Sequence, residues 1–502
     1  MNSFVILILM WVISSFWSLP QEPPARKYGN KISSADLKAN LSILASDAME
    51  GRETGKRGQK MAAAFIRANF EELELDGPLD GDYYQTMDLY QRGPAETYVR
   101  TETTRYDNFT DIVYYGSDNS GGEVSVPLVF VGNATQVDFD QVDVKDKAVL
   151  LFSQSEWIAG NKAVALAKER GARMVFVCNV SDKDVYGVQL GRIKANATNS
   201  RLSLKYPTPI EDQRPGLFIV SPRIVDKLLG VTLDKLLEVS DDPKAKSIKK
   251  IKPVLISYKT SMTVKVIKSE NVLGFLEGKD KKNELLIISS HYDHIGIKQS
   301  GTGDLINNGA DDDGSGTVAV IELAKVFALA KKEGYGPRRS ILFMTFTGEE
   351  SGLLGSEFYT EHPVFPLGET VVELNIDMVG RRDALHQESA PYIYVIGADQ
   401  LSSELNVISE SVNKAHTNLI FDYTYNDQRH PERLYYRSDH WNFAKNNIPI
   451  IFYFDGIHED YHKPSDEIEK IEFDLLTERT KCIFFMAWEI ANREARIMPD
   501  IK

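Results

Sequence analysis

Six acidic and histidine side chains in the second half of the chain have the types and positions expected of a hydrolytic metal site. They are His291, Asp312, Glu349, Glu350, Asp377 and His462. Each lies where an apolar run of the sequence breaks, and imidazoles and carboxylates are common zinc ligands. All nine histidines of this 502-residue chain lie at position 291 or beyond. The sequence therefore places metal chemistry, with room for two ions, in the C-terminal half.

The apolar runs before these residues predict the elements that position them. We expect strands at 284–290, 340–347, 371–378 and 448–454, and helices at 316–330 and 475–492. This alternation predicts an α/β fold with a doubly wound, mostly parallel sheet covered by helices on both faces. Functional groups of such sheets gather at the carboxyl ends of the strands. Four of the candidate positions follow strands in this way.

An acidic triplet, residues 311–313, precedes the predicted helix at 316–330. Helix capping explains one or two acids, at about 0.3–1 kcal/mol each, but three successive carboxylates need further compensation. One carboxylate can bridge two metal ions about 3.5–4 Å apart, and such a pair lowers the pKa of a shared water. Of the adjacent Glu349 and Glu350, one can bind metal while the other takes a proton from this water. A solvated acidic pair is the alternative interpretation.

Four segments resemble the signatures of the co-catalytic zinc exopeptidases, the family of secreted bacterial aminopeptidases, aminopeptidase Y and glutamate carboxypeptidase. The segments are HYDHIG at 291–296, GADDDGSG at 309–316, GEESGLLGS at 348–356 and NIDM at 375–378. Their order, spacing and strand context match over roughly residues 30–110 and 265–495. The resemblance implies a zinc aminopeptidase-like fold.

The resemblance also implies two Zn²⁺ ions per chain, held by five side chains. His291 and Asp377 are expected at one ion, Glu350 and His462 at the other, and Asp312 as the bridge between them. Glu349 is then the general base. Asp311 and Asp313 occupy positions that vary in the family, so we assign them to structure.

Several further residues near the ligands receive roles from the same resemblance. Asp293 is expected to hold the imidazole of His291 in its ligand tautomer, as the chemistry of metal-bound histidine also requires. Tyr435 is expected to hydrogen-bond the tetrahedral oxyanion, with Tyr461, beside a ligand, as an alternative. His294 follows the first ligand by three positions, and we assign it to packing rather than to metal binding.

The middle of the chain differs from its flanks. Short apolar runs at 126–131, 148–152, 174–178 and 217–220 predict strands, and one helical stretch at 163–170 separates two of them. Residues 128–132 (LVFVG) and 142–150 (VDVKDKAVL) resemble a protease-associated domain, which in this family shapes substrate access. We therefore expect a discontinuous peptidase domain at 25–110 and 262–502, interrupted by a β-rich protease-associated insert at 111–261.

Composition limits the partners and the compartment. A net charge of −14 and a pI near 5.3 argue against a nucleic-acid partner. Residues 4–13 form an apolar run typical of a secretory signal, so residues 1–20 are predicted to be a signal peptide. We expect a secreted or periplasmic protein without stable membrane association after signal removal; its oligomeric state is left open. Cys178 and Cys482 are predicted to be core thiols rather than a disulfide.

The predicted function is a secreted metallo-exopeptidase that removes N-terminal residues from peptides. A carboxypeptidase or dipeptidase with the same metals is an alternative. The arginines that could bind a substrate carboxylate in such an enzyme are Arg381, Arg382, Arg429, Arg433 and Arg437. A glutaminyl cyclase-like enzyme would use one zinc, and an inactive receptor-like ectodomain should have lost ligands. The complete set of five ligands weighs against both.

Overall fold

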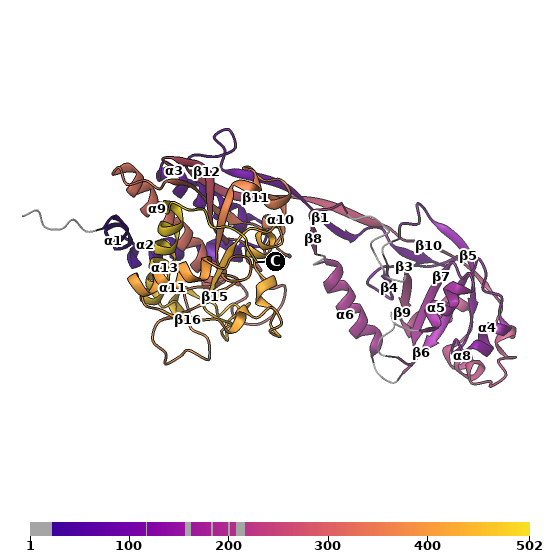
Figure 1. The fold of residues 1–502 in the computed structure, drawn as a ribbon. Helices are drawn as coiled ribbons and strands as arrows, with labels where there is room; N and C mark the ends of the chain where they lie inside the picture. Colours follow the sequence, from indigo (N-terminus) through magenta and orange to yellow (C-terminus); the bar gives the residue numbers. More distant parts are fainter. Residues whose placement is uncertain are drawn as a thin grey trace, which may run out of the picture. The chain divides into compact units, whose positions relative to one another are not determined.

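The structure, a computed structural model, describes residues 23–116, 118–155, 162–181, 184–198, 201–206 and 216–501. The predicted signal peptide lies outside these residues. The chain forms two compact units (Figure 1), one made of the residues up to Thr86 and from Ser269 onward, the other of Met87–Lys268. The second unit is longer at both ends than the insert expected from the sequence.

The first unit is built on a mixed sheet whose centre is parallel. Its strands are β1 (Tyr84–Pro94), β11 (Met262–Leu276), β12 (Lys281–His291), β13 (Arg339–Phe346), β14 (Thr370–Ile376), β15 (Tyr392–Ile396), β16 (Ile420–Asp422) and β17 (Ile450–Phe454). They lie in the order β16-β15-β17-β14-β12-β13-β11-β1. The four central strands, β17, β14, β12 and β13, are parallel neighbours, while β15 and β11 pair antiparallel on either side. The prediction of a largely parallel α/β sheet is confirmed for this centre.

Alternate residues of β12 enter two separate hydrophobic clusters. Leu286 and Ile288 pack in one, and Leu285 and Ile287 in the other. The first cluster takes in side chains of α2 (Ser34–Leu44), α3 (Arg57–Glu72), α9 (Gly316–Lys332), α11 (Leu405–His416) and α13 (Phe473–Asn492). The second takes in α10 (Leu354–Glu361) and α12 (His440–Ala444). Helices therefore cover both faces of the sheet, as the sequence predicts.

Two of the central strands, β13 and β14, are buried along their whole length. Every residue of β13 and β14 is buried, which is why these strands appear in the sequence as continuous apolar runs rather than as an alternating pattern. Helix α9 begins at Gly316, as predicted. Its residues from Gly316 to Ala324 are all buried, so the helix is covered on more than the single stripe expected of an amphipathic helix.

The second unit carries its own sheet, in the order β3-β2-β10-β5-β6-β7-β9-β4. Its strands are β2 (Tyr98–Arg100), β3 (Arg105–Asp107), β4 (Ile112–Tyr115), β5 (Val124–Phe130), β6 (Ala148–Ser153), β7 (Met174–Asn179), β9 (Leu217–Val220) and β10 (Val254–Lys259); the short β8 (Leu202–Ser203) pairs with β1. The four predicted strands are present as β5, β6, β7 and β9, which run parallel.

Helices are more frequent in this unit than its sequence suggests. Helix α5 (Lys162–Glu169) is the one expected, and the structure adds α4 (Gln136–Gln141), α6 (Val185–Thr198), α7 (Val225–Leu229) and α8 (Leu233–Ser240). Helix α4 starts with a capping box formed by Thr135 and Asp138, a local signal that its short apolar pattern conceals. None of the helices in the described ranges is long and apolar enough to cross a membrane.

Candidate metal centre

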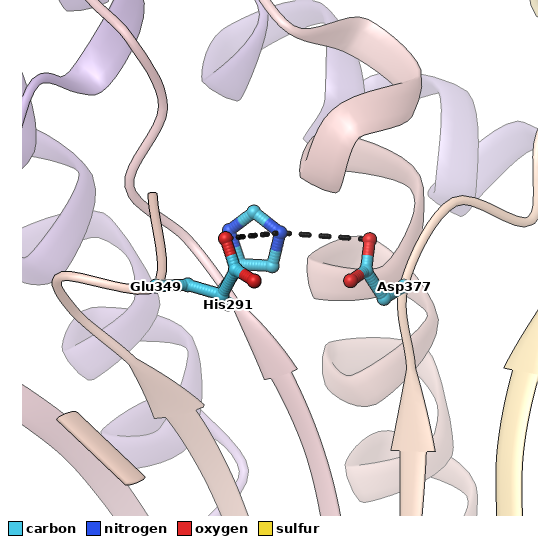
Figure 2. A group of neighbouring side chains, drawn as sticks. All are labelled: His291, Glu349 and Asp377. Atoms are coloured by element: carbon cyan, nitrogen blue, oxygen red, sulfur yellow. Dashed lines mark ion pairs between the residues drawn. The ribbon is translucent and has the colours of Figure 1, made fainter. Parts of the chain in front are cut away.

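The six candidate side chains converge at the carboxyl edge of the parallel strands. His291 is the last residue of β12, and Asp377 directly follows β14. Glu349 and Glu350 lie in the turn after β13, and Asp312 lies in the turn that leads into α9. Figure 2 shows His291, Glu349 and Asp377 meeting above the ends of their strands. The parallel order of the strands thus brings together residues far apart in the sequence.

Asp312 lies between two groups of ligand atoms and presents one oxygen to each. Its Oδ1 is 3.3 Å from His291 Nε2, and its Oδ2 is 3.1 Å from His462 Nε2. On the first side Asp377 Oδ1 lies 3.5 Å from His291 Nε2, and on the second Glu350 Oε2 lies 3.1 Å from His462 Nε2. The structure therefore brings all five predicted ligands together, with Asp312 in the bridging position.

The donor atoms of this cluster fit zinc. Two N or O donors on one zinc, with bonds of about 2.0–2.2 Å, lie about 2.9–3.5 Å apart, which matches the separations around Asp312. Asp312 Oδ2 and Glu350 Oε1 are buried and have no hydrogen-bond partner within the described part of the chain. Two adjacent sets of potential ligands stand out among these residues, His291 with Glu349 and Asp377, and His294 with Asp312 and Glu350.

The charges of the site also call for cations. Burial raises the pKa of Asp312, but the surrounding imidazoles outweigh it and hold that pKa well below its usual range. Burial lowers the pKa of His462, but the adjacent carboxylates of Asp312 and Glu350 raise it to about 10 overall. In the metal-free protein, protonated imidazoles thus supply the positive charge that buried carboxylates need. Bound metal ions would supply it instead.

Glu349 lies farther from the His291 imidazole than the other two carboxylates around it do. Its Oε2 lies 3.9 Å from His291 Nε2, farther than the oxygens of Asp312 and Asp377. Burial raises the pKa of Glu349 well above its usual range; the nearby Glu350 adds to this and His291 opposes it. A carboxylate with a raised pKa beside the ligands can exchange a proton at neutral pH.

Asp293 contacts the site through both its main chain and its side chain. Its carbonyl oxygen lies 3.0 Å from His291 Nδ1, whereas its nearest carboxylate oxygen lies 3.9 Å from that nitrogen. The carboxylate instead accepts hydrogen bonds from the Glu349 main-chain N at 3.1 Å and the Thr54 hydroxyl at 2.6 Å. The carbonyl thus takes the orienting role predicted for the carboxylate, and the carboxylate positions the turn that carries Glu349.

Tyr435 is the one predicted site residue that the structure does not bring to this cluster. It is buried among aromatic rings, packing against Tyr436 and Trp441, and burial raises its pKa to about 12. A pocket that opens onto His291, Asp312, Glu349 and Asp377 is lined instead by Tyr461. The Tyr461 ring stacks on His462 at 3.9 Å between centroids. Tyr461, weighed from the sequence as an alternative to Tyr435, therefore lies at the pocket.

Two further residues, Arg52 and Ser438, hold the ligands in place. The buried Arg52 guanidinium donates to the carbonyls of Tyr292 and Gly309, both at 2.8 Å, and so joins the loops of His291 and Asp312. Ser438 donates from its hydroxyl to Asp377 Oδ2 at 2.6 Å. Long-range partners of this kind leave no local pattern in a sequence.

The acidic triplet also divides as expected. Asp313 accepts hydrogen bonds from the main-chain N atoms of His291, Gly316 and Met378, at 2.9 to 3.1 Å. Asp466 accepts from the main-chain N atoms of Asp311 and Asp312, each at 3.1 Å at the closest. Only the middle carboxylate of the triplet therefore faces the ligand cluster.

The fold and the site define an α/β domain with an acidic, histidine-bearing centre at its strand ends. Residues 271–486 match the model of Peptidase family M28, so this part of the chain is similar to that family. The match confirms the resemblance to the co-catalytic zinc exopeptidases, and with it the enzyme class, a metal-dependent peptidase.

Two relatives and one solved structure illustrate the similarity. Aminopeptidase YwaD of Bacillus subtilis strain 168 is 25% identical over 463 residues, covering 90% of this chain and 84% of the relative. Aminopeptidase NAALADL1 of Rattus norvegicus is 36% identical over 112 residues, which cover 22% of this chain and 14% of that protein. The structure of an aminopeptidase from Aneurinibacillus sp. strain AM-1 is 18% identical, with a TM-score of 0.49 and coverage of 95% and 98%.

Proposed function

We propose that the protein is a zinc-dependent aminopeptidase that releases N-terminal residues from peptides with two zinc ions and Glu349 as general base. The observation that carries the proposal is the position of Asp312, whose two oxygens face two separate groups of nitrogen and oxygen donors. The relative that aligns with most of the chain is an aminopeptidase, which favours attack at the N-terminal end of the substrate.

The residues of the site have three tasks: to bind the ions, to transfer a proton and to stabilise the negative charge that develops on the substrate. Zinc ions bound by His291 with Asp377, Glu350 with His462, and Asp312 between them would polarise the scissile carbonyl and make water more acidic. Glu349 accepts a proton from the attacking water and passes it to the leaving amine. The Tyr461 hydroxyl donates a hydrogen bond to the oxygen on which negative charge develops. Burial and nearby carboxylates raise the pKa of Tyr461, which keeps it protonated as a donor.

The test compares substrates that expose opposite ends. Purified protein is assayed with aminoacyl reporters and with N-blocked peptides that have a free carboxyl terminus, with and without a chelator. The proposal expects hydrolysis of the reporters, loss of activity with the chelator and its return with Zn²⁺. Cleavage restricted to the N-blocked peptides would contradict it. Metal analysis of the purified protein should give two zinc ions per chain.

A second candidate, a carboxypeptidase or dipeptidase, has one observation in its favour. Of the five arginines considered, Arg437 lines the pocket beside Tyr461. Its Nη2 lies 3.4 Å from the Tyr461 hydroxyl and its Nη1 lies 3.2 Å from Glu432. Arg381 and Arg382 pair instead with Asp460 and Glu472. A guanidinium at this position could bind a substrate carboxylate, and the substrate panel distinguishes the two candidates.

Two further assignments belong to the same proposal. We assign the second unit, Met87–Lys268, to the protease-associated type on the strength of its strand sequence, with substrate access as its role. We assign the protein to a secreted or periplasmic location because of its predicted signal peptide. Detection of the purified protein's N-terminus beyond residue 20, after expression with export, tests the second assignment.

A further inference from the structure

One more imidazole lies against the cluster, in addition to the five predicted ligands. We propose that His294 is a direct donor to the metal ion held by Asp312, Glu350 and His462, so that this ion is bound by two imidazoles. The inference rests on the proposed two-metal function, because it concerns the ligands of one of the two sites.

His294 and His462 flank the Glu350 carboxylate from opposite sides. His294 Nδ1 lies 2.8 Å from Glu350 Oε1 and 3.8 Å from Asp312 Oδ2, whereas His462 Nε2 faces Glu350 Oε2 at 3.1 Å. The two rings meet nearly edge to face, with centroids 5.7 Å apart and an interplanar angle of 70°. The His294 side chain is fully buried, so no water reaches it from bulk solvent.

The ring nitrogens of His294 have no hydrogen-bond partner within the described ranges, and the same holds for Glu350 Oε1 and Asp312 Oδ2. His294 Nδ1 and Glu350 Oε1 are close enough for a hydrogen bond. They do not form one because the ring N–H does not point at the oxygen. Buried polar atoms left unpaired cost about 1–3 kcal/mol each. A cation at the point where His294 Nδ1, Glu350 Oε1 and Asp312 Oδ2 converge would give these three atoms a partner. The two oxygens lie 2.8 and 3.8 Å from Nδ1, just outside the range of about 2.9–3.5 Å for two donors on one zinc.

The surrounding chain is shaped to hold this ring. A Cβ at Gly309 would lie 2.6 Å from His294 Cδ2 and 2.7 Å from its Cγ, so the absent side chain makes room for the imidazole. The His294 main-chain N donates to the Arg52 carbonyl at 3.2 Å. The ring therefore has a fixed place beside the acidic turn, as a metal ligand requires.

A positioning role is the competing explanation, in which a His294 N–H holds Glu350 in place. Asparagine separates the two roles, because its amide can replace the Nδ1–H donor but is a poor zinc ligand compared with imidazole. We would compare His294→Asn and His294→Ala with the wild-type protein and with His440→Asn. His440 is a matched control, since its imidazole is equally buried but lies in neither set of potential ligands.

The readout is zinc affinity in the full-length apoprotein, measured by competition with a chromophoric chelator, together with the visible spectrum after Co²⁺ loading. We expect both His294 variants to bind the more weakly held of the two zinc ions at least 100-fold less tightly and to show a changed Co²⁺ spectrum. The zinc affinity of His440→Asn should stay within threefold of wild type. A loss of an outer partner costs about 10–100-fold, so a smaller loss in His294→Asn overturns the proposal. Wild-type protein that binds fewer than two ions contradicts the proposed function itself.

Discussion

Replacing Glu349 by glutamine should abolish proton transfer while leaving the metal ions bound. Glutamine keeps the size of the side chain but cannot accept the proton. The metal ligands should keep their geometry in this variant, because Glu349 is the most distant of the three carboxylates around His291. Its Oε2 lies 3.9 Å from His291 Nε2. A general base contributes about 10²–10⁴-fold to the rate, which corresponds to roughly 3–5.5 kcal/mol at 1.4 kcal/mol per tenfold change.

The assay is kcat on an aminoacyl reporter together with the zinc content of the same sample. Glu349→Gln should retain two zinc ions, with kcat lower by the factor above. The adjacent Glu350→Gln is the matched control and should lose zinc from the site it shares with His462. The wild-type rate should fall at acidic pH, because the base becomes protonated. This fall should be absent from the pH–rate profile of Glu349→Gln. Loss of zinc from Glu349→Gln, or activity above a tenth of wild type, would refute the assignment.

Three further predictions, with four substitutions, test other parts of the site. Tyr461→Phe should lower kcat by about 10²–10³-fold, the usual effect of removing one oxyanion donor, whereas Tyr435→Phe should stay within threefold; the reverse result would restore the original assignment. Arg437→Ala should leave hydrolysis of C-terminally amidated peptides within threefold, and a tenfold loss confined to peptides with a free carboxylate would favour the second candidate. Burial raises the pKa of Asp439 to about 7, above its value in the unfolded chain. The folded apoprotein therefore holds this proton more strongly than the unfolded chain does. As pH rises from about 4 to 7, the unfolded chain loses the proton first, so the free energy of unfolding falls by at most ~4 kcal/mol. The free energy of unfolding, measured with urea at pH 5 and at pH 8, should fall between the two pH values in the wild type and should fall less in Asp439→Asn. An equal fall in the two proteins would contradict the prediction.

The ligand positions were predictable because their signals are local. Four of the five, His291, Glu350, Asp377 and His462, come after an apolar run long enough for a buried strand, and Asp312 comes just before a predicted helix. The parallel order of the central strands brings the strand ends to one edge. The bounds of β13 and α9 differ from the predicted ones by one or two residues. The antiparallel β15 and β11 were not predictable, because strand direction depends on which connection the folded chain adopts and not on the composition of the strand.

Residues whose roles depend on distant partners could not be assigned from the sequence. Tyr435 and Tyr461 both lie near motif residues, and only the fold shows that one ring enters an aromatic cluster and the other the pocket. His294 resembles an ordinary packed histidine until Glu350 and Asp312 are seen beside it. The resemblance assigned the carboxylate of Asp293 to His291, but this carboxylate accepts a hydrogen bond from Thr54, which lies 239 positions away.

Arg52 contributes a positive charge to this cluster of buried acids. It is fully buried, and although burial lowers its pKa, the carboxylates of Asp312, Asp466 and Asp313 oppose this shift. A guanidinium remains charged under all ordinary conditions, so it offers the cluster a permanent positive charge. Because its N–H groups also bind the carbonyls beside His291 and Asp312, the same side chain fixes the spacing of both loops. The geometry of the predicted ligands therefore depends on a residue that is not itself one of them.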